Sequence, residues 1–477
     1  MPESLKKKTV KGVAWTSLDQ ALNLGFGFVI GVILARLLSP SDYGLLAMIA
    51  VFNSIAFAFV NSGFGSALVR KPDLVEDDTT TAFFFNIIVS VGMIGILWVA
   101  APFIASFYDK PILTSLVRAE AVILIISALG LVQNTQLTRA LNFKAKMIIN
   151  ASSQVLAGVL AIVAAYRGFG VWALVVQHYV GNVVSLILMW VFSPWRPRGK
   201  WSKVSLKYLW GYGSRILASG LLNRIYGNIY PIIIGKFYSA ADLGQYSRAS
   251  GYAGLPARGL TDVLQQVTFP VLSQIQEDDA RLSNSYRRML RFTVFLVFPV
   301  MMGMAALAYP LVISLVTDKW AECVPYLQVI CFASMWYPVH AINLDLLKVK
   351  GRSDLFLRLE IIKKVIVTVV IFVCVPFGIM GICYGAIFTS LASLAINTYY
   401  TGKFIHVGFF RQMMDMIPTL LNSMVMGAVI YLVTSPMTNE LLKLAVGIPL
   451  GIVVYLVIAW VFRLPELKEA IDIIRRK

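Results

Sequence analysis

Several arginine residues stand inside apolar stretches long enough to cross a membrane. Arg224 and Arg258 lie near the middle of two such stretches, and Arg215 and Arg248 lie on the same two. A charged side chain inside a bilayer costs about 2.5–3.5 kcal/mol on insertion scales, so by default it marks a transport pathway. Guanidinium groups bind oxyanions through paired hydrogen bonds. These residues therefore predict an anion-binding site within the membrane.

A purely structural explanation exists for part of this set. At about 100° per residue, Arg248, Arg258 and Asp262 fall within an arc of about 80° on one helix. Arg258 and Asp262 are four residues apart and could pair with each other without meeting a substrate. Arg215 falls near the cytoplasmic end of its stretch, where anchoring to lipid headgroups explains it as well as binding in a cavity does.

Polar residues also interrupt the apolar stretches of the first half. Asn23 and Asn53 are candidates to line a substrate path, and Asp19 lies one helical turn before Asn23. Three intramembrane acids could carry a coupling ion or form ion pairs: Asp19, Asp262 and Asp345. The sequence leaves these two roles open.

The residues that usually support catalysis are scattered. The three histidines (His178, His340 and His406) and the four cysteines show no metal-ligand spacing, and no phosphate-binding loop is present. We therefore predict no catalytic residue, no metal and no cofactor. A membrane enzyme is the alternative from another class, but it needs positioned acids or bases in an accessible cleft, and the predicted outer loops are short.

Composition indicates what holds these residues in place. The 477 residues are 58% hydrophobic and 14% charged, whereas soluble domains are about 45–50% apolar and about 25% charged. One membrane span needs about 20 apolar residues. We predict an all-α integral membrane protein with about fourteen transmembrane helices. The expected ranges are 12–38, 43–69, 80–107, 114–137, 147–166, 171–193, 208–237, 242–272, 288–316, 321–347, 356–375, 379–402, 413–434 and 440–462.

The net charge of +18 fits a membrane topology. With these helices, Lys and Arg residues gather in alternate loops, as they do on the cytoplasmic side of membrane proteins. We therefore expect both termini to be cytoplasmic.

The chain repeats itself weakly. The segment ILARLLSPSDYGLL (33–46) aligns with IIGKFYSAADLGQY (233–246), so that Ser39, Asp42 and Gly44 match Ser239, Asp242 and Gly244. Serine, proline and aspartate at such a position suit a turn and a helix N-cap. Six helices per repeat predict two lobes related by an axis along the membrane normal, with a site between them. The expected parts are an N-lobe (1–195), a basic linker (196–207), a C-lobe (208–404) and a final helix pair with a tail (405–477).

The motif KGVAWTSL, followed by ILARLLSPSDYGLLAM, resembles the polysaccharide-transporter branch of the multidrug/oligosaccharidyl-lipid/polysaccharide (MOP) exporter superfamily, the Wzx-type flippases. The resemblance covers nearly the whole chain, and the twelve-plus-two helix plan is also similar to lipid II flippases. It implies a polyprenyl-pyrophosphate-linked oligosaccharide as substrate, turned from the cytoplasmic to the outer leaflet of the inner membrane by alternating access. The arginines would then hold the pyrophosphate.

The same resemblance implies membrane lipids as partners, together with polysaccharide polymerase or export machinery. Because membrane topology explains the positive charge, we expect no nucleic acid partner, and the two-lobe plan predicts a chain that works as a monomer. The alternative is a drug or metabolite cation antiporter of the same superfamily. Such antiporters carry cation-attracting acids, whereas the intramembrane charges here are mostly cationic.

Overall fold

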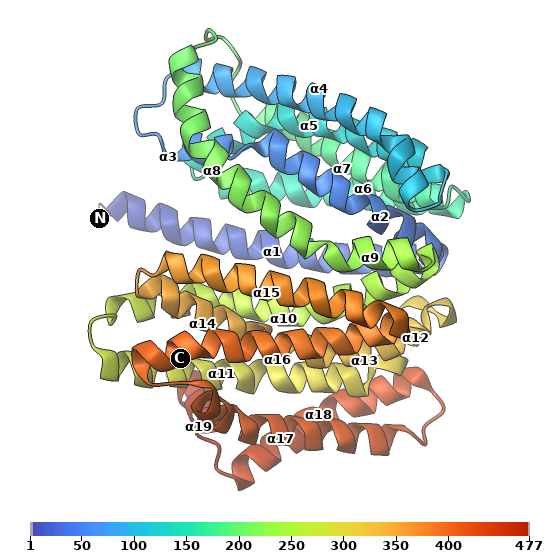
Figure 1. Cartoon of the computed structure of the whole chain (residues 1–477), viewed down its shortest axis with the longest axis vertical. Helices are drawn as coiled ribbons and strands as arrows, with labels where there is room; N and C mark the ends of the chain where they lie inside the picture. The colour runs from blue at the N-terminus through green and yellow to red at the C-terminus, as the bar shows by residue number, and fades with distance from the viewer. Residues whose placement is uncertain (1–2, 476–477) are drawn as a thin grey trace. The chain divides into compact units, whose positions relative to one another are not determined.

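A computed structural model describes residues 3–475, and every regular element within that range is helical (Figure 1). The chain divides into two compact units, Met1–Gly244 and Gln245–Lys477. The lobe boundaries expected near residues 195 and 208 remain a prediction, because this division follows compactness alone.

Unit 1 is built from paired long helices. Helix α1 packs on α6, α6 on α7, and α4 on α5 (Figure 1). Alanines at 161, 164 and 173 let α1, α6 and α7 approach closely around Leu34 and Leu174. The helices are α1 (Glu3–Leu37), α2 (Pro40–Asn61), α3 (Phe64–Arg70), α4 (Glu76–Phe107), α5 (Ile112–Arg139), α6 (Phe143–Tyr166), α7 (Val171–Phe192), α8 (Lys203–Gly227), α9 (Ile229–Phe237) and the start of α10 (Ala240–Gln274).

Unit 2 is centred on α11, which packs against α17, while α13 and α15 pack against α16 (Figure 1). Its elements after α10 are α11 (Asp279–Ala306), α12 (Ala308–Val316), η1 (Asp318–Trp320), α13 (Cys323–Ser334), α14 (Tyr337–Val349), α15 (Ser353–Cys374), η2 (Val375–Phe377), α16 (Gly378–Ile405), α17 (Phe409–Thr434), α18 (Glu440–Val461) and α19 (Pro465–Arg475). The α11 helix starts earlier than the 288 expected, because the Asp278 side chain accepts a hydrogen bond from the backbone N–H of Arg281 and caps it.

Three of the predicted spans are interrupted helices. The span expected at 208–237 consists of α8 and α9, that at 288–316 of α11 and α12, and that at 321–347 of α13 and α14. With each interrupted pair taken as one pass, and α3 as the end of α2, the described chain makes six passes up to Phe192, six from Lys203 to Ile405, and two more in α17 and α18. This confirms the predicted fold of fourteen transmembrane helices.

Length and hydropathy alone identify ten candidate spans in the described residues, and one of them, Asp354–Ile405, contains both α15 and α16. The passes that this criterion leaves out are α8–α9, α10 and α13–α14. Helices α13 and α14 are individually short, with 12 and 13 residues. Helices α8 and α10 are long, with 25 and 35 residues, so they are left out because they are too polar.

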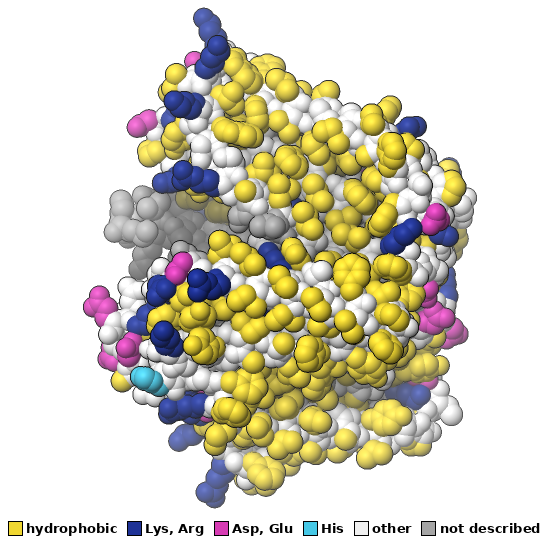
Figure 2. Space-filling model, in the orientation of Figure 1, with side chains coloured by type: hydrophobic (Ala, Val, Ile, Leu, Met, Phe, Trp, Pro, Cys, Tyr) yellow, Lys and Arg dark blue, Asp and Glu magenta, His cyan; other side chains and the backbone are white. Residues whose placement is uncertain are grey.

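The surface fits a lipid environment. Large apolar side chains such as Val99, Phe103 and Trp460 are about 70% exposed. In Figure 2, hydrophobic side chains cover the visible face along the helices, and charged side chains gather mainly toward the helix ends. The chain is a multi-pass membrane protein.

The repeated motif forms the same structure twice. The Ser39 backbone N–H donates to the Asp42 carboxylate at 2.9 Å, and the Asp42 N–H donates to Ser39 Oγ at 3.3 Å. The corresponding distances for Ser239 and Asp242 are both 3.1 Å. Each copy is thus a capping box that starts a helix. The interpretation of the motif as a turn and N-cap is confirmed.

Candidate functional site

Arg224 lies directly before the break between α8 and α9. Pro231 has no backbone N–H, so it cannot donate to the carbonyl of Gly227 and the helix cannot continue regularly there. Asn228 occupies the break, and its side-chain amide donates to the Arg224 carbonyl at 2.7 Å and to Ser54 Oγ on α2 at 3.4 Å. Arg224 is exposed. Breaks in spanning helices are typical of binding sites in transporters.

Arg215 does not share the exposed face of Arg224. The two residues are nine positions apart on α8, which at about 100° per residue places them about half a turn out of phase. Arg215 is also exposed. One helix face therefore carries only one of the two arginines.

In unit 2, α10 holds Arg248 and Arg258 in different surroundings. The Arg248 guanidinium lies 4.9 Å from the ring centre of Trp320 and 5.7 Å from that of Tyr252. Aromatic faces attract a cation and hold this side chain in place. Arg258 and Asp262 are both exposed, and no ion pair joins them among the interactions of the described residues. The ion-pair alternative therefore has no contact to support it.

Two of the predicted polar residues meet on the α1–α6 contact. The Asn23 amide donates to Asp19 at 2.7 Å, and Asn150 of α6 donates to the other oxygen of the same carboxylate at 3.0 Å. Gln154 donates to the Asn23 carbonyl at 3.0 Å. The sequence interpretation missed Asn150 and Gln154, although both lie on one face of a helix one turn apart.

Asn53 contacts an acid that the sequence interpretation did not select. Its amide donates to Glu120 of α5 at 3.5 Å, and His178 of α7 contacts the same carboxylate at 3.1 Å. Glu120 is only 4% exposed.

Asp345 bridges two helices of unit 2. It is buried and accepts a hydrogen bond from Gln265 of α10 at 2.6 Å, and it pairs with Lys348 at 2.9 Å. The Gln265 contact links α10 to α14, whereas the Lys348 pair lies within α14 itself.

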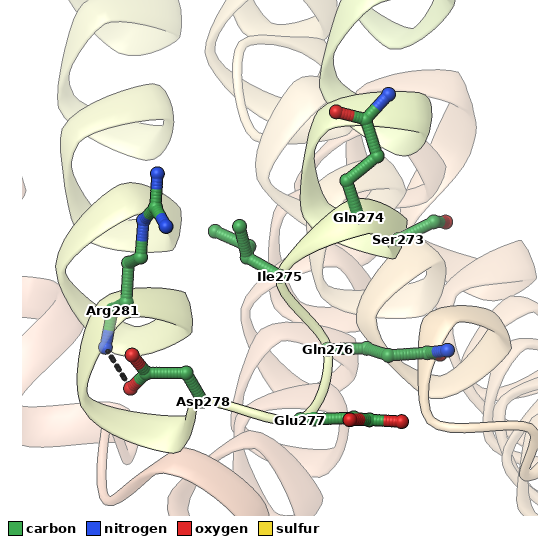
Figure 3. A pocket seen from close by; sticks show the side chains of 7 residues that line it. All are labelled: Ser273, Gln274, Ile275, Gln276, Glu277, Asp278 and Arg281. Carbon is green, nitrogen blue, oxygen red and sulfur yellow. Dashed lines mark hydrogen bonds between the residues drawn. The ribbon is translucent and has the colours of Figure 1, made fainter.

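A cavity of about 340 Å³ lies at the loop between α10 and α11, lined by Ser273, Gln274, Ile275, Gln276, Glu277, Asp278 and Arg281 (Figure 3). Its Asp278 carboxylate accepts the backbone N–H of Arg281 at 2.9 Å, the cap that starts α11 (Figure 3). This cavity contains none of the predicted site residues. The loop between α10 and α11 and the adjacent helix ends form it, so we do not assign it to a transport path.

A family model described as "Polysaccharide biosynthesis protein" matches residues 33–325. The chain belongs to this family. The matched region includes both copies of the repeated motif and all four candidate arginines. The resemblance to a polysaccharide family inferred from ILARLLSPSDYGLLAM is thereby confirmed, and the chain is a multi-pass membrane protein of that family.

Individual relatives and a solved structure resemble the chain over most of its length. The succinoglycan biosynthesis transport protein ExoT of Rhizobium meliloti (strain 1021) is 25% identical over 494 residues, which cover 100% of this chain and 98% of ExoT. The teichuronic acid biosynthesis protein TuaB of Bacillus subtilis (strain 168) is 26% identical over 74% of this chain and 73% of TuaB. The lipid II flippase MurJ, in an inward closed conformation, shares the fold with a TM-score of 0.76 and 14% identity, covering 95% of this chain and 98% of that one.

Proposed function

We propose that this polysaccharide biosynthesis protein flips a polyprenyl-pyrophosphate-linked oligosaccharide from the cytoplasmic to the outer leaflet of the inner membrane. The cell-surface product would be an O-antigen, a capsule or an exopolysaccharide. Both termini lie in the cytoplasm, and the chain works as a monomer alongside a polysaccharide polymerase or export machinery. It transports its substrate and does not alter it. The relatives named for succinoglycan and teichuronic acid synthesis support this substrate class.

The observation that carries the proposal is the polarity of α8 and α10. They are long helices within a fourteen-pass bundle, yet neither is apolar enough to be a candidate span. A membrane pass that faces lipid does not carry an exposed arginine near its middle, as the α8–α9 pass does with Arg224 and α10 does with Arg258. We infer that each of these helices faces water rather than lipid around its arginine, and that each arginine attracts the pyrophosphate.

The other predicted residues take supporting places in this proposal. Arg248, held by Trp320 and Tyr252, adds positive charge on α10. Asn23 and Asn53 offer amide groups to the sugar. Outward movement of an anion from a negative cytoplasm gains about 2.3 kcal/mol per charge per 100 mV, so no nucleotide is needed.

The experiment uses purified full-length chain in liposomes and compares one oligosaccharide on two carriers, polyprenyl pyrophosphate and polyprenyl monophosphate. We expect faster flipping of the pyrophosphate lipid by the wild type. A charge-assisted hydrogen bond is worth about 1.5–3 kcal/mol, so Arg224→Ala combined with Arg258→Ala should reduce that rate about tenfold or more. Arg411→Ala removes an exposed arginine on α17 and serves as the matched control. Equal rates for both carriers in the wild type would exclude pyrophosphate recognition.

A further inference from the structure

A buried carboxylate and an imidazole meet within the membrane-spanning part of unit 1. Glu120 of α5 is 4% exposed, and His178 Nδ1 lies 3.1 Å from its Oε1 and 3.2 Å from its Oε2. The His178 side chain is 45% exposed. The buried carboxylate is therefore joined to the surface of the helix bundle through a single ring.

Few other charges face this pair among the described residues. From α7, Tyr179 donates to the Ala119 carbonyl beside it. From α2, the uncharged Asn53 contacts the carboxylate. Arg118 lies on α5 itself and turns to the Trp98 carbonyl of α4.

The remaining neighbours of α5 meet it farther along the helix. Lys146 of α6 donates to Thr138, and Arg139 at the end of α5 donates to the Leu68 carbonyl of α3. At about 1.5 Å per residue, these cations lie more than 25 Å along α5 from Glu120. His178 is therefore the one described side chain able to neutralise the carboxylate directly.

We propose that Glu120 and His178 form a proton-binding site, whose occupancy is coupled to the break between α8 and α9. With one shared proton the pair is neutral overall, as carboxylate and imidazolium or as acid and imidazole, and the proton moves between Nδ1 and a carboxylate oxygen. Loss of that proton leaves a buried negative charge, and gain of a second leaves a positive one. Both changes are costly inside a membrane, so the state with one shared proton is favoured.

The link to the helix break runs through α2. Asn53 contacts Glu120, and its neighbour Ser54 accepts the Asn228 amide at the break. The Oδ1 atom of Asn53 is buried without a hydrogen-bond partner. If Glu120 becomes a carboxylic acid, rotation of the Asn53 amide presents this oxygen as an acceptor for the acid proton. Proton arrival therefore changes the hydrogen bonding of α2 next to Ser54, which accepts from Asn228 at the break, and Asn228 in turn donates to the Arg224 carbonyl.

The first test measures proton binding without any transport substrate, so it does not depend on the proposed function. Full-length protein in lipid nanodiscs is titrated while infrared difference spectra follow the carboxylic acid C=O band. We expect a band in the wild type that is lost in Glu120→Gln and retained in Tyr179→Phe, which removes a neighbouring α5–α7 hydrogen bond but keeps both titrating groups. In His178→Gln the pH dependence of the band should differ from that of the wild type, because the carboxylate has lost the group that shares its proton. Spectra of Glu120→Gln and His178→Gln that both match the wild type would overturn the site.

The second test measures coupling and rests on the proposed function. Flipping of a polyprenyl-pyrophosphate-linked oligosaccharide is measured in liposomes with and without a pH gradient. We expect the gradient to change the rate in the wild type and in Tyr179→Phe, and to leave the rate of Glu120→Gln unchanged. A gradient response in Glu120→Gln equal to that of the wild type would exclude coupling at this pair. Absence of flipping by the wild type would reject the proposed function, while the infrared result would still decide the proton site.

Discussion

Gly44 and Gly244, two hundred positions apart, each lie against the other's helix-start turn. A Cβ atom on Gly44 would stand 1.6 Å from the carbonyl oxygen of Ala240, and one on Gly244 would stand 1.9 Å from that of Pro40. The two copies of the repeated motif thus contact each other reciprocally through their backbones. Glycine is needed at both positions because only a hydrogen atom fits between them.

Replacing either glycine should destabilise unit 1. Overpacking usually costs about 1–3 kcal/mol, and Gly44→Ala and Gly244→Ala should fall at the upper end because backbone atoms cannot yield as side chains do. Thermal unfolding followed by size-exclusion chromatography would measure the loss. Gly92→Ala on α4 is the matched control, since a methyl group added there would have no neighbouring atom within 4 Å. Unchanged unfolding temperatures for Gly44→Ala and Gly244→Ala would show that the contact is not tight.

The two capping boxes should contribute similar amounts to stability. Removal of an N-cap hydroxyl costs about 1 kcal/mol, so Ser39→Ala and Ser239→Ala should each lower the unfolding temperature, with nearly equal effects. Ser115→Ala removes a hydroxyl that bonds only to the backbone of its own helix and should have little effect. A large difference between the two caps would contradict their structural equivalence.

A partly buried ion pair joins α17, the first helix of the final pair, to α11. Arg287 donates to both carboxylate oxygens of Asp415 on α17, at 2.7 and 2.6 Å. The two side chains are 25% and 8% exposed. Breaking a fully buried pair costs about 3–5 kcal/mol, and partial exposure reduces this, so Asp415→Ala should cost about 2 kcal/mol.

Limited proteolysis of the segment before α17 would report this loss. The exchanged double variant Arg287→Asp with Asp415→Arg should restore part of the protection. Full protection in Asp415→Ala alone would mean that apolar packing holds α17 without the pair.

The tail helix α19 should become less stably packed as the pH rises. Burial is the main cause that raises the pKa of Glu466, while Arg291, 3.4 Å away, opposes the shift. The folded state therefore binds the Glu466 proton more tightly than the unfolded state does. The ordinary pKa of a glutamate is about 4.5, so the stability that this group contributes declines as the pH rises from that value through the raised pKa of the folded state. A spin label at the exposed position 468 should become more mobile over that range in the wild type. Glu466→Gln should remove this pH dependence, and an unchanged dependence would assign it to another group.

Local chemistry was predictable from the sequence where partners lie within a few residues. Ser39 and Asp42 indicated a helix cap, and Asp19 and Asn23, one turn apart, proved to be bonded. The count of fourteen passes followed from apolar stretches taken together with turn and charge signals between them. These features depend on spacing along one helix, which the sequence shows directly.

Partners on different helices were not predictable. Glu120 and His178 are 58 positions apart, and no regular spacing relates them. Conversely, the i, i+4 spacing of Arg258 and Asp262 predicted an ion pair that is absent from the contacts of the described residues, where both side chains are exposed. The break after Arg224 could have been anticipated from Gly227, Asn228 and Pro231, which together disfavour a continuous helix.

The most direct test of the account follows radiolabelled polyprenyl-linked oligosaccharide in cells that lack this protein, with an added enzyme that reaches only outer-leaflet sugar. We expect the labelled lipid to remain protected on the inside, and to become accessible when the wild type or Arg411→Ala is restored. The double variant Arg224→Ala with Arg258→Ala should insert normally and leave the lipid protected, while lysine at both positions should restore part of the movement. Normal outward movement in cells without the protein, or full activity of the double alanine variant, would contradict the account.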